Sequence, residues 1–152
     1  MLSALQSSWT AHTIAQSQML TAGLSAVHLL GFTLVMGSAV VSNLRMLGAV
    51  FLDQPATAIT RPASRALLLG ACVSVTTGFL LFLPRAVGAS RNDFFRVKIL
   101  LLVAAALFHL VVQRRVAATA SAAPGLSRMV GAVGLALWLG LAVAAGAFIL
   151  IE

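Results

Sequence analysis

Four long apolar runs leave this chain few ways to fold. They cover about residues 19–44, 62–83, 94–113 and 126–151, and the charged residues and prolines gather between them. Each run has the roughly 20 residues that an α-helix needs to cross about 30 Å of hydrocarbon. A helix also satisfies its own backbone hydrogen bonds, as a segment in lipid must. The sequence therefore predicts an all-α fold, a bundle of four transmembrane helices.

The composition agrees with a membrane protein. Of the 152 residues, 61% are hydrophobic and 9% are charged, and the mean hydropathy is +1.05. A soluble domain is only about 45–50% apolar. Little sequence is left outside the four runs, so we expect a single membrane domain over residues 1–152. The first run is too long for a signal-peptide core, and residues 1–18 lack Lys and Arg, so we expect it to be a retained span.

The segment before the first span has the pattern of a surface helix. Over residues 2–17, Leu2, Leu5 and Trp9 fall on one side of a helix, and Ser and Gln fall opposite. This spacing predicts a short amphipathic helix that lies in the membrane interface.

Basic residues predict the orientation. The connections after the first and third spans carry six of them: Arg45, Arg61, Arg65, Arg114, Arg115 and Arg128. The other side carries four, namely Arg85, Arg91, Arg96 and Lys98. Because cytoplasmic loops are richer in Lys and Arg, we expect both termini to be periplasmic in a bacterial inner membrane. The basic residues form no patch with interleaved aromatic residues, so nucleic acid is not an expected partner.

Three ionisable side chains lie inside predicted spans: His28 in the first, and Lys98 and His109 in the third. Such groups are costly in lipid unless they have partners, which makes them candidates for a functional site. His28 falls on a stripe of small and polar residues along its helix. Lys98 and His109 are eleven residues apart and so point within about 20° of one another. Both faces are predicted to point into the bundle.

An imidazole in an apolar bundle is a good axial ligand for haem iron. We therefore expect a b-type haem between the first and third spans, with His28 as a metal ligand and His109 as the second ligand or none. The two histidines differ in predicted depth by about 9 Å, which argues against their pairing on one upright ring. Arg91, Arg96 and Lys98 are expected to pair with haem propionates. Trp138, in the fourth span, either packs in the core or stacks on the cofactor.

An alternative interpretation needs no cofactor. Histidines in membrane helices serve as hydrogen-bond partners between helices, and a Ser or Thr hydroxyl of the second span would satisfy His28. The abundance of Gly and Ala favours tight association, either in a homo-oligomer or in a larger membrane complex.

Two stretches carry a family resemblance. SAVHLLGFTLVMGSAVVSNLRMLG (25–48) and FFRVKILLLVAAALFH (94–109) resemble an uncharacterised family of small four-helix bacterial membrane proteins, a domain of unknown function. More distantly, they are similar to the copper-resistance D-type membrane domain and to the haem-binding membrane protoporphyrinogen oxidase. The oxidase resemblance implies a haem-ligand role for His28 and an essential role for Lys98. The chain has Phe108 where that family has tyrosine, so haem binding is expected more than enzymatic activity.

Three functions follow, in order. The first is a haem b protein for electron transfer or redox accessory work, exchanging electrons with quinone or a membrane partner and with a periplasmic acceptor. The second is a non-redox structural or self-assembling membrane subunit. The third is an enzyme similar to protoporphyrinogen oxidase.

Overall fold

The computed structural model describes residues 2–119 and 123–151. Its elements in chain order are α1 (Leu2–Gln6), α2 (Trp9–Gln16), α3 (Gln18–Leu47), α4 (Ala56–Phe82), the 3-10 turn η1 (Leu83–Arg85), α5 (Ala86–Arg91), α6 (Asp93–Phe108), the π-helical turn η2 (His109–Gln113), α7 (Arg114–Ala118) and α8 (Pro124–Ile151). Within these described ranges every regular element is helical. The predicted all-α fold is confirmed.

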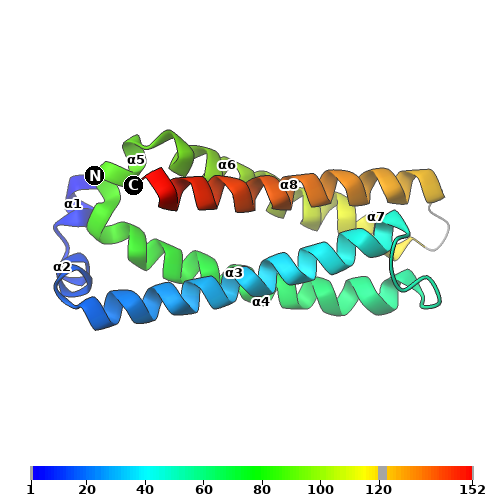
Figure 1. Cartoon of the computed structure of the whole chain (residues 1–152), viewed down its shortest axis with the longest axis horizontal. Helices are drawn as coiled ribbons and strands as arrows, with labels where there is room; N and C mark the ends of the chain where they lie inside the picture. The colour runs from blue at the N-terminus through cyan, green and yellow to red at the C-terminus, as the bar shows by residue number, and fades with distance from the viewer. Residues whose placement is uncertain (1, 120–122, 152) are drawn as a thin grey trace.

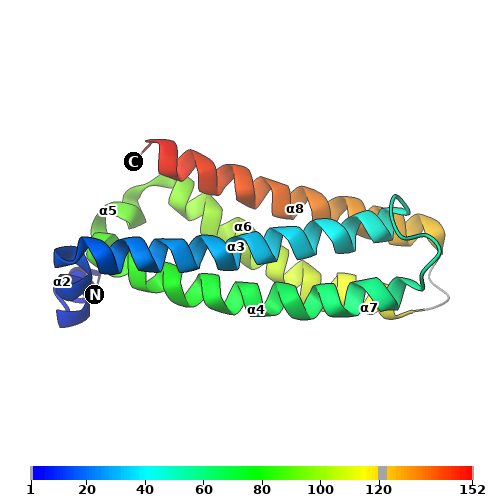
Figure 2. The ribbon, with the colours of Figure 1, turned by 60° about the horizontal axis from the view of Figure 1, so that its bottom comes forward.

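Among the described residues, four helical segments are long and apolar enough to cross a membrane: Gln18–Leu47, Ala56–Arg91, Asp93–Ala118 and Pro124–Phe148. In Figure 1 they run side by side along the length of the molecule, and the turned view of Figure 2 shows the same arrangement. Both termini lie at one end, and the α3–α4 and α7–α8 connections lie at the other. An even number of spans places the two termini on the same side of the bilayer. The chain is a multi-pass membrane protein.

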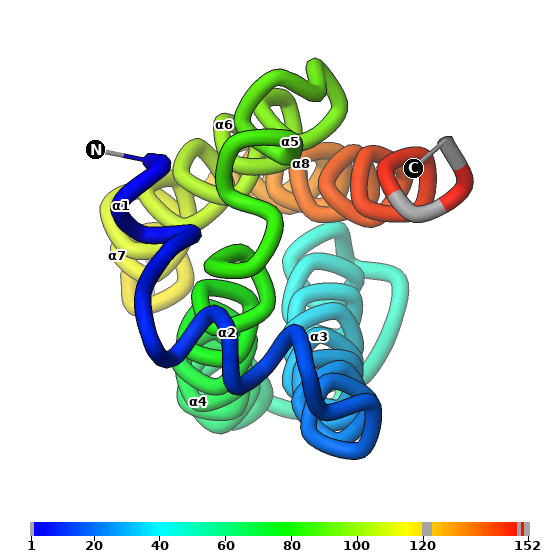
Figure 3. Tube along the Cα trace, turned by 90° about the vertical axis from the view of Figure 1, so that its left-hand side faces the viewer, coloured from blue at the N-terminus to red at the C-terminus, as the bar shows by residue number. Residues whose placement is uncertain are grey.

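The predicted surface segment is helical in two pieces. It breaks at Ser7 and Ser8, where the Ser8 hydroxyl caps α2 by accepting a hydrogen bond from the Ala11 N–H at 3.3 Å. Figure 3 shows α1 and α2 crossing one end of the bundle. Ala11 and Ile14 are buried against it, whereas Trp9 is 81% exposed and points away from the protein.

Helices α3 and α4 pack closely at two glycines, Gly31 and Gly70. A Cβ atom on Gly31 would lie 3.0 Å from the Gly70 carbonyl oxygen, and one on Gly70 would lie 2.7 Å from the Gly31 carbonyl oxygen. Small residues at such a crossing let two helix backbones pack closely in lipid, where van der Waals contact is a main source of helix association. This crossing sets the register of α3 against α4.

The apolar core lies near the middle of the bundle. It joins side chains of α3, α4, α6 and α8: Val35, Ala39, Leu67, Ala105, Trp138 and Leu141. The predicted inward stripe of the first span is confirmed over Gly31, Val35, Ala39 and Ser42, all of which are buried. Ala105, His109 and Gln113 confirm the predicted inward face of the third span, since all three are buried.

Two helices extend beyond the predicted spans. The second span was expected to begin at Pro62, but α4 begins at Ala56, with Pro55 as its N-cap residue. Pro62 lies in the second turn on an exposed position, where the carbonyl that loses its hydrogen bond is accessible to solvent or lipid headgroups. The third span was expected to end at 113, but the helix passes through η2 and ends at Ala118.

Candidate functional site

The two histidines of the spans lie at different levels of the bundle. His28 contacts Ser74 of α4, whereas His109 contacts Ser64 of the same helix. Ser64 and Ser74 are ten residues apart, which corresponds to about 15 Å along a helix axis. The unequal depth expected from the sequence is therefore present, and the structure does not bring His28 and His109 together.

His28 projects from α3 onto α4. Its Nδ1 lies 2.9 Å from the Ser74 carbonyl oxygen and 3.2 Å from Thr77 Oγ1. A carbonyl oxygen only accepts, so Nδ1 carries the proton and donates. The Thr77 hydroxyl donates its own proton to the Val73 carbonyl at 2.7 Å and offers a lone pair to His28. These contacts determine the tautomer of His28.

Gly78 makes room for the His28 ring. A Cβ atom at position 78 would lie 2.9 Å from Cε1 and 3.3 Å from Nδ1 of the imidazole. The glycine therefore allows the ring to lie close against the α4 backbone. With Nδ1 protonated and the ring neutral, Nε2 holds the lone pair, and it forms no hydrogen bond with any residue in the described ranges.

Lys98 is the basic residue that the structure brings to His28. Its ammonium is close enough to interact electrostatically with the imidazole. The same ammonium lies 5.6 Å from the ring centroid of Phe148 on α8, a cation–π contact. We call His28, Ser74, Thr77, Gly78 and Lys98 the His28 site; it joins α3, α4 and α6.

The other two predicted basic residues lie elsewhere. Arg91 is exposed at the end of α5. Arg96 forms a 3.6 Å ion pair with Asp93, and its Nε donates to the Ser90 carbonyl at 2.9 Å. Both partners of Arg96 are its neighbours in the sequence. Of the three residues expected to pair with propionates, only Lys98 interacts with His28 in the part of the chain that the structure describes.

His109 is at the centre of a buried network. Its Nδ1 donates to Gln113 Oε1 at 3.0 Å, and its Nε2 accepts from the Ser64 hydroxyl at 2.9 Å. Gln113 Nε2 in turn donates to Ser42 Oγ and to Asn43 Oδ1, each at 3.2 Å. Both ring nitrogens of His109 are thus occupied by protein partners, and its side chain is 1% exposed. In this geometry His109 has no free nitrogen for a metal.

We call His109, Gln113, Ser42, Asn43 and Ser64 the His109 network. It links α3, α4 and η2, and the close approach of α8 completes its enclosure. A Cβ atom on Gly134 of α8 would collide with Asn43 Oδ1. Asn43 Nδ2 donates to the Ala39 carbonyl at 2.7 Å, so the amide is satisfied at both ends. Full satisfaction is what a buried polar network needs to be stable.

The site predicted from the sequence did not include Asn43, Ser64 and Gln113. A signal existed for Gln113, which follows His109 by four residues and so shares its helix face. Asn43 stands next to the inward stripe of the first span. No sequence pattern indicated Ser64 as a partner of His109, because that contact depends on how α4 packs against η2.

Trp138 lies in the apolar core of the bundle. It is 1% exposed and belongs to the apolar core with Leu67, Leu141 and Ala105. This position is in the core rather than in either polar site.

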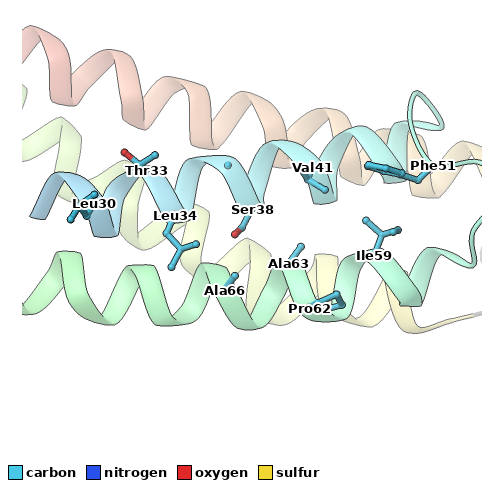
Figure 4. A pocket seen from close by; sticks show the side chains of 11 residues that line it. Leu30, Thr33, Leu34, Ser38, Val41, Phe51, Ile59, Pro62, Ala63 and Ala66 are labelled. Carbon is cyan, nitrogen blue, oxygen red and sulfur yellow. The ribbon is translucent and has the colours of Figure 1, made fainter. Parts of the chain in front are cut away.

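Described residues line an open groove and a cavity. An open groove of about 710 Å³ runs between α3 and α4, and Figure 4 shows its lining, which is mostly apolar and includes Leu34, Ala63 and Ala66. Its surroundings suit lipid tails. A second cavity of about 350 Å³ lies between α4, η2 and α7, beside the His109 network. Among the described residues no group of three or more His, Cys, Asp or Glu side chains is placed to hold a metal ion.

The fold and its two polar sites define a four-span membrane protein with a histidine between helices at each of two levels. The chain belongs to a family of unknown function (DUF6644), whose model matches residues 13–151. This agrees with the resemblance to an uncharacterised family. No curated protein and no solved structure matches the chain. The comparisons show no similarity to the copper-resistance D-type domain or to protoporphyrinogen oxidase.

Proposed function

We propose that this protein binds haem b in the membrane and serves electron transfer or redox accessory work, with His28 as the axial ligand through Nε2. One observation carries this function: His28 donates Nδ1–H to the Ser74 carbonyl at 2.9 Å. Histidines that bind metals almost always donate their other ring N–H to a carbonyl or carboxylate, which orients the ring and raises its basicity. Nε2 is then the nitrogen with the lone pair.

The surroundings of His28 fit the same role. Gly78 lets the ring lie against the α4 backbone, which fixes its position, and the Thr77 hydroxyl adds a second acceptor for Nδ1–H. Lys98 supplies a positive charge near His28 that would pair with a haem propionate.

A single histidine is proposed as the protein ligand. His109 already uses both ring nitrogens, and it lies about 15 Å away along α4. Bound haem supplies one-electron redox chemistry. The protein orients the ligand ring, balances charge and keeps the site in an apolar bundle, with quinone or a membrane protein as one redox partner and a periplasmic protein as the other.

The proposal is tested by an absorption spectrum of protein purified in detergent after expression with adequate haem. We expect a Soret band that shifts on reduction and is absent from His28→Gln. His12→Gln is the matched control, because His12 is exposed on α2 outside the spans, and it should keep the band. His109→Gln should also keep it if the variant folds. A colourless wild-type protein, or an unchanged band in His28→Gln, would contradict haem ligation.

A second function has its own supporting observation. Both histidines bridge helices: His28 joins α3 to α4, and His109 joins η2 to α4. A non-redox structural subunit, in a homo-oligomer or a larger membrane complex, needs no more than this. It requires that the wild type be colourless and that His28→Gln lower the thermal midpoint. A protoporphyrinogen-oxidase-like enzyme ranks third, and complementation of a strain that lacks this step tests it.

We place the protein in a bacterial inner membrane with periplasmic termini, because six basic residues lie on one side and four on the other. In a Cys72→Ser background, Ser3→Cys should react with a membrane-impermeant maleimide on spheroplasts. Ala118→Cys, at the opposite end of the bundle, should react only after lysis. The reverse pattern would invert the orientation.

A further inference from the structure

The second cavity lies at the end of the bundle opposite the termini. We call it the arginine cavity, because Arg61, Arg65 and Arg114 are among the residues that line it. Two of these come from α4 and one from the start of α7. Its volume of about 350 Å³ accommodates a small polar group. We infer that this cavity binds a phosphate-type oxyanion, either the headgroup of an anionic lipid or a free phosphate.

Among the described residues, no acidic side chain neutralises the three arginines. In the described ranges the acids are Asp53, in the α3–α4 connection, and Asp93, which pairs with Arg96 at the other end of the bundle. Arg61, Arg65 and Arg114 form no ion pair with any of these described residues. Three positive charges on residues that line one cavity repel each other. A bound anion removes that repulsion.

Hydroxyl groups are also available in the cavity. Thr57 and Thr60 of α4 line it, and neither hydroxyl forms a hydrogen bond with another residue in the part of the chain described. Thr60 is only 5% exposed, so its hydroxyl belongs to the wall of the cavity and not to the open surface. Hydroxyl donors together with planar, bidentate guanidinium groups suit a tetrahedral oxyanion.

The His109 network forms the floor of the cavity. Ser42, Ser64, His109 and Gln113 all line it and are all buried. Their hydrogen bonds hold η2 against α3 and α4. The Arg114 backbone N–H donates to the His109 carbonyl five residues earlier, which is the bond of a π-helical turn. Such turns often occur at functional sites. The network thereby positions Arg114, whose charge is close enough to interact with His109.

The location suits a ligand at the membrane surface. Arg61 and Arg65 lie in the first three turns of α4, and Arg114 lies near the end of the third span, where headgroups meet the protein. Basic pockets between spans on the cytoplasmic side commonly bind acidic headgroups. This inference is independent of haem, because the cavity shares no residue with the His28 site.

The test measures the thermal midpoint of the whole protein in a neutral detergent. Three additions are compared: a short-chain phosphatidylglycerol, phosphatidylcholine with the same chains, and inorganic phosphate. We expect phosphatidylglycerol to raise the midpoint more than phosphatidylcholine does. If inorganic phosphate by itself raises the midpoint in a saturable way, the ligand is a free oxyanion. If phosphatidylglycerol raises the midpoint and inorganic phosphate does not, the ligand is the lipid headgroup. If neither phosphatidylglycerol nor inorganic phosphate raises the midpoint, the inference is wrong.

The matched pair of variants is Arg114→Gln and Arg115→Gln, since Arg115 is the next residue and does not line the cavity. Arg114→Gln should raise the half-saturating anion concentration by about tenfold or more, because it removes a charge-assisted hydrogen bond. Arg115→Gln should leave it nearly unchanged. Equal weakening in both would show only general surface attraction and would refute the site. Arg61→Gln and Thr60→Val provide the same comparison if Arg114→Gln does not fold.

Discussion

Gly70→Ala is expected to lower the free energy of unfolding by about 1–3 kcal/mol, the usual cost of overpacking a tight contact. The added Cβ would lie 2.7 Å from the Gly31 carbonyl oxygen and 3.0 Å from the Val35 backbone nitrogen. Both are backbone atoms, which cannot turn aside as a side chain does. Helices α3 and α4 would have to separate. The measurement is the thermal midpoint in detergent, followed by circular dichroism.

Gly37→Ala on α3 is the matched control, because a Cβ atom there would meet no atom within 4 Å. It should be neutral or slightly stabilising, since alanine is favoured over glycine in a helix by up to about 1 kcal/mol. If Gly70→Ala were as stable as Gly37→Ala, the close crossing of α3 and α4 would be wrong.

Gln113→Leu is expected to lower the free energy of unfolding at least as much as Gly70→Ala does. The leucine would remove one hydrogen bond from His109 and two that Gln113 donates to Ser42 and Asn43. It would leave His109 Nδ1–H and Asn43 Oδ1 buried without a partner, and each such group costs about 1–3 kcal/mol. We expect a lowered unfolding midpoint and a lower yield of folded protein.

Gln16→Leu makes the same chemical change on an exposed position of α2 and should have little effect. Gln113→Glu keeps the shape of the side chain and changes only its hydrogen bonding and charge. The carboxylate keeps an acceptor for His109 but loses both donors, and it places a charge beside Asn43 Oδ1. It should therefore also destabilise. A stable Gln113→Leu would mean that the His109 network does not hold η2 in place.

Helix α4 is the common support of both polar sites. Along one side it presents Ser64 to His109, Gly70 to Gly31, and Ser74 with Gly78 to His28. The small residues of its second half pack against α3. The same small side chains bring the α4 backbone close enough for its carbonyl at Ser74 to accept from an imidazole. Packing and polar chemistry therefore depend on the same face.

Much of the fold was predictable from local patterns. The four spans follow from apolar length, and the inward faces follow from the spacing of small and polar residues around each helix. The early start of α4 was missed because Pro62 was taken as a helix start, although α4 tolerates proline on its exposed side. The break between α1 and α2 was missed because a Ser8 cap competes with a continuous helix at short range.

The site was predictable only in part. His28, Lys98 and His109 stand out from the sequence because an ionisable group in lipid needs a partner. Which partner each one has depends on the register between helices, and that register is set by the Gly31–Gly70 contact. Hence Ser64, Asn43 and the arginine cavity could not be read from any single span.

The chain alone thus determines that four helices cross a membrane, which faces turn inward and which side chains need partners there. These properties are local, since they follow from the length, period and transfer cost of consecutive residues. The tertiary structure decides that His28 Nε2 has no hydrogen bond to any described residue, while His109 has both nitrogens occupied. It also separates the two by about 15 Å along α4. That difference comes from contacts between distant segments, which only the packing of the bundle specifies.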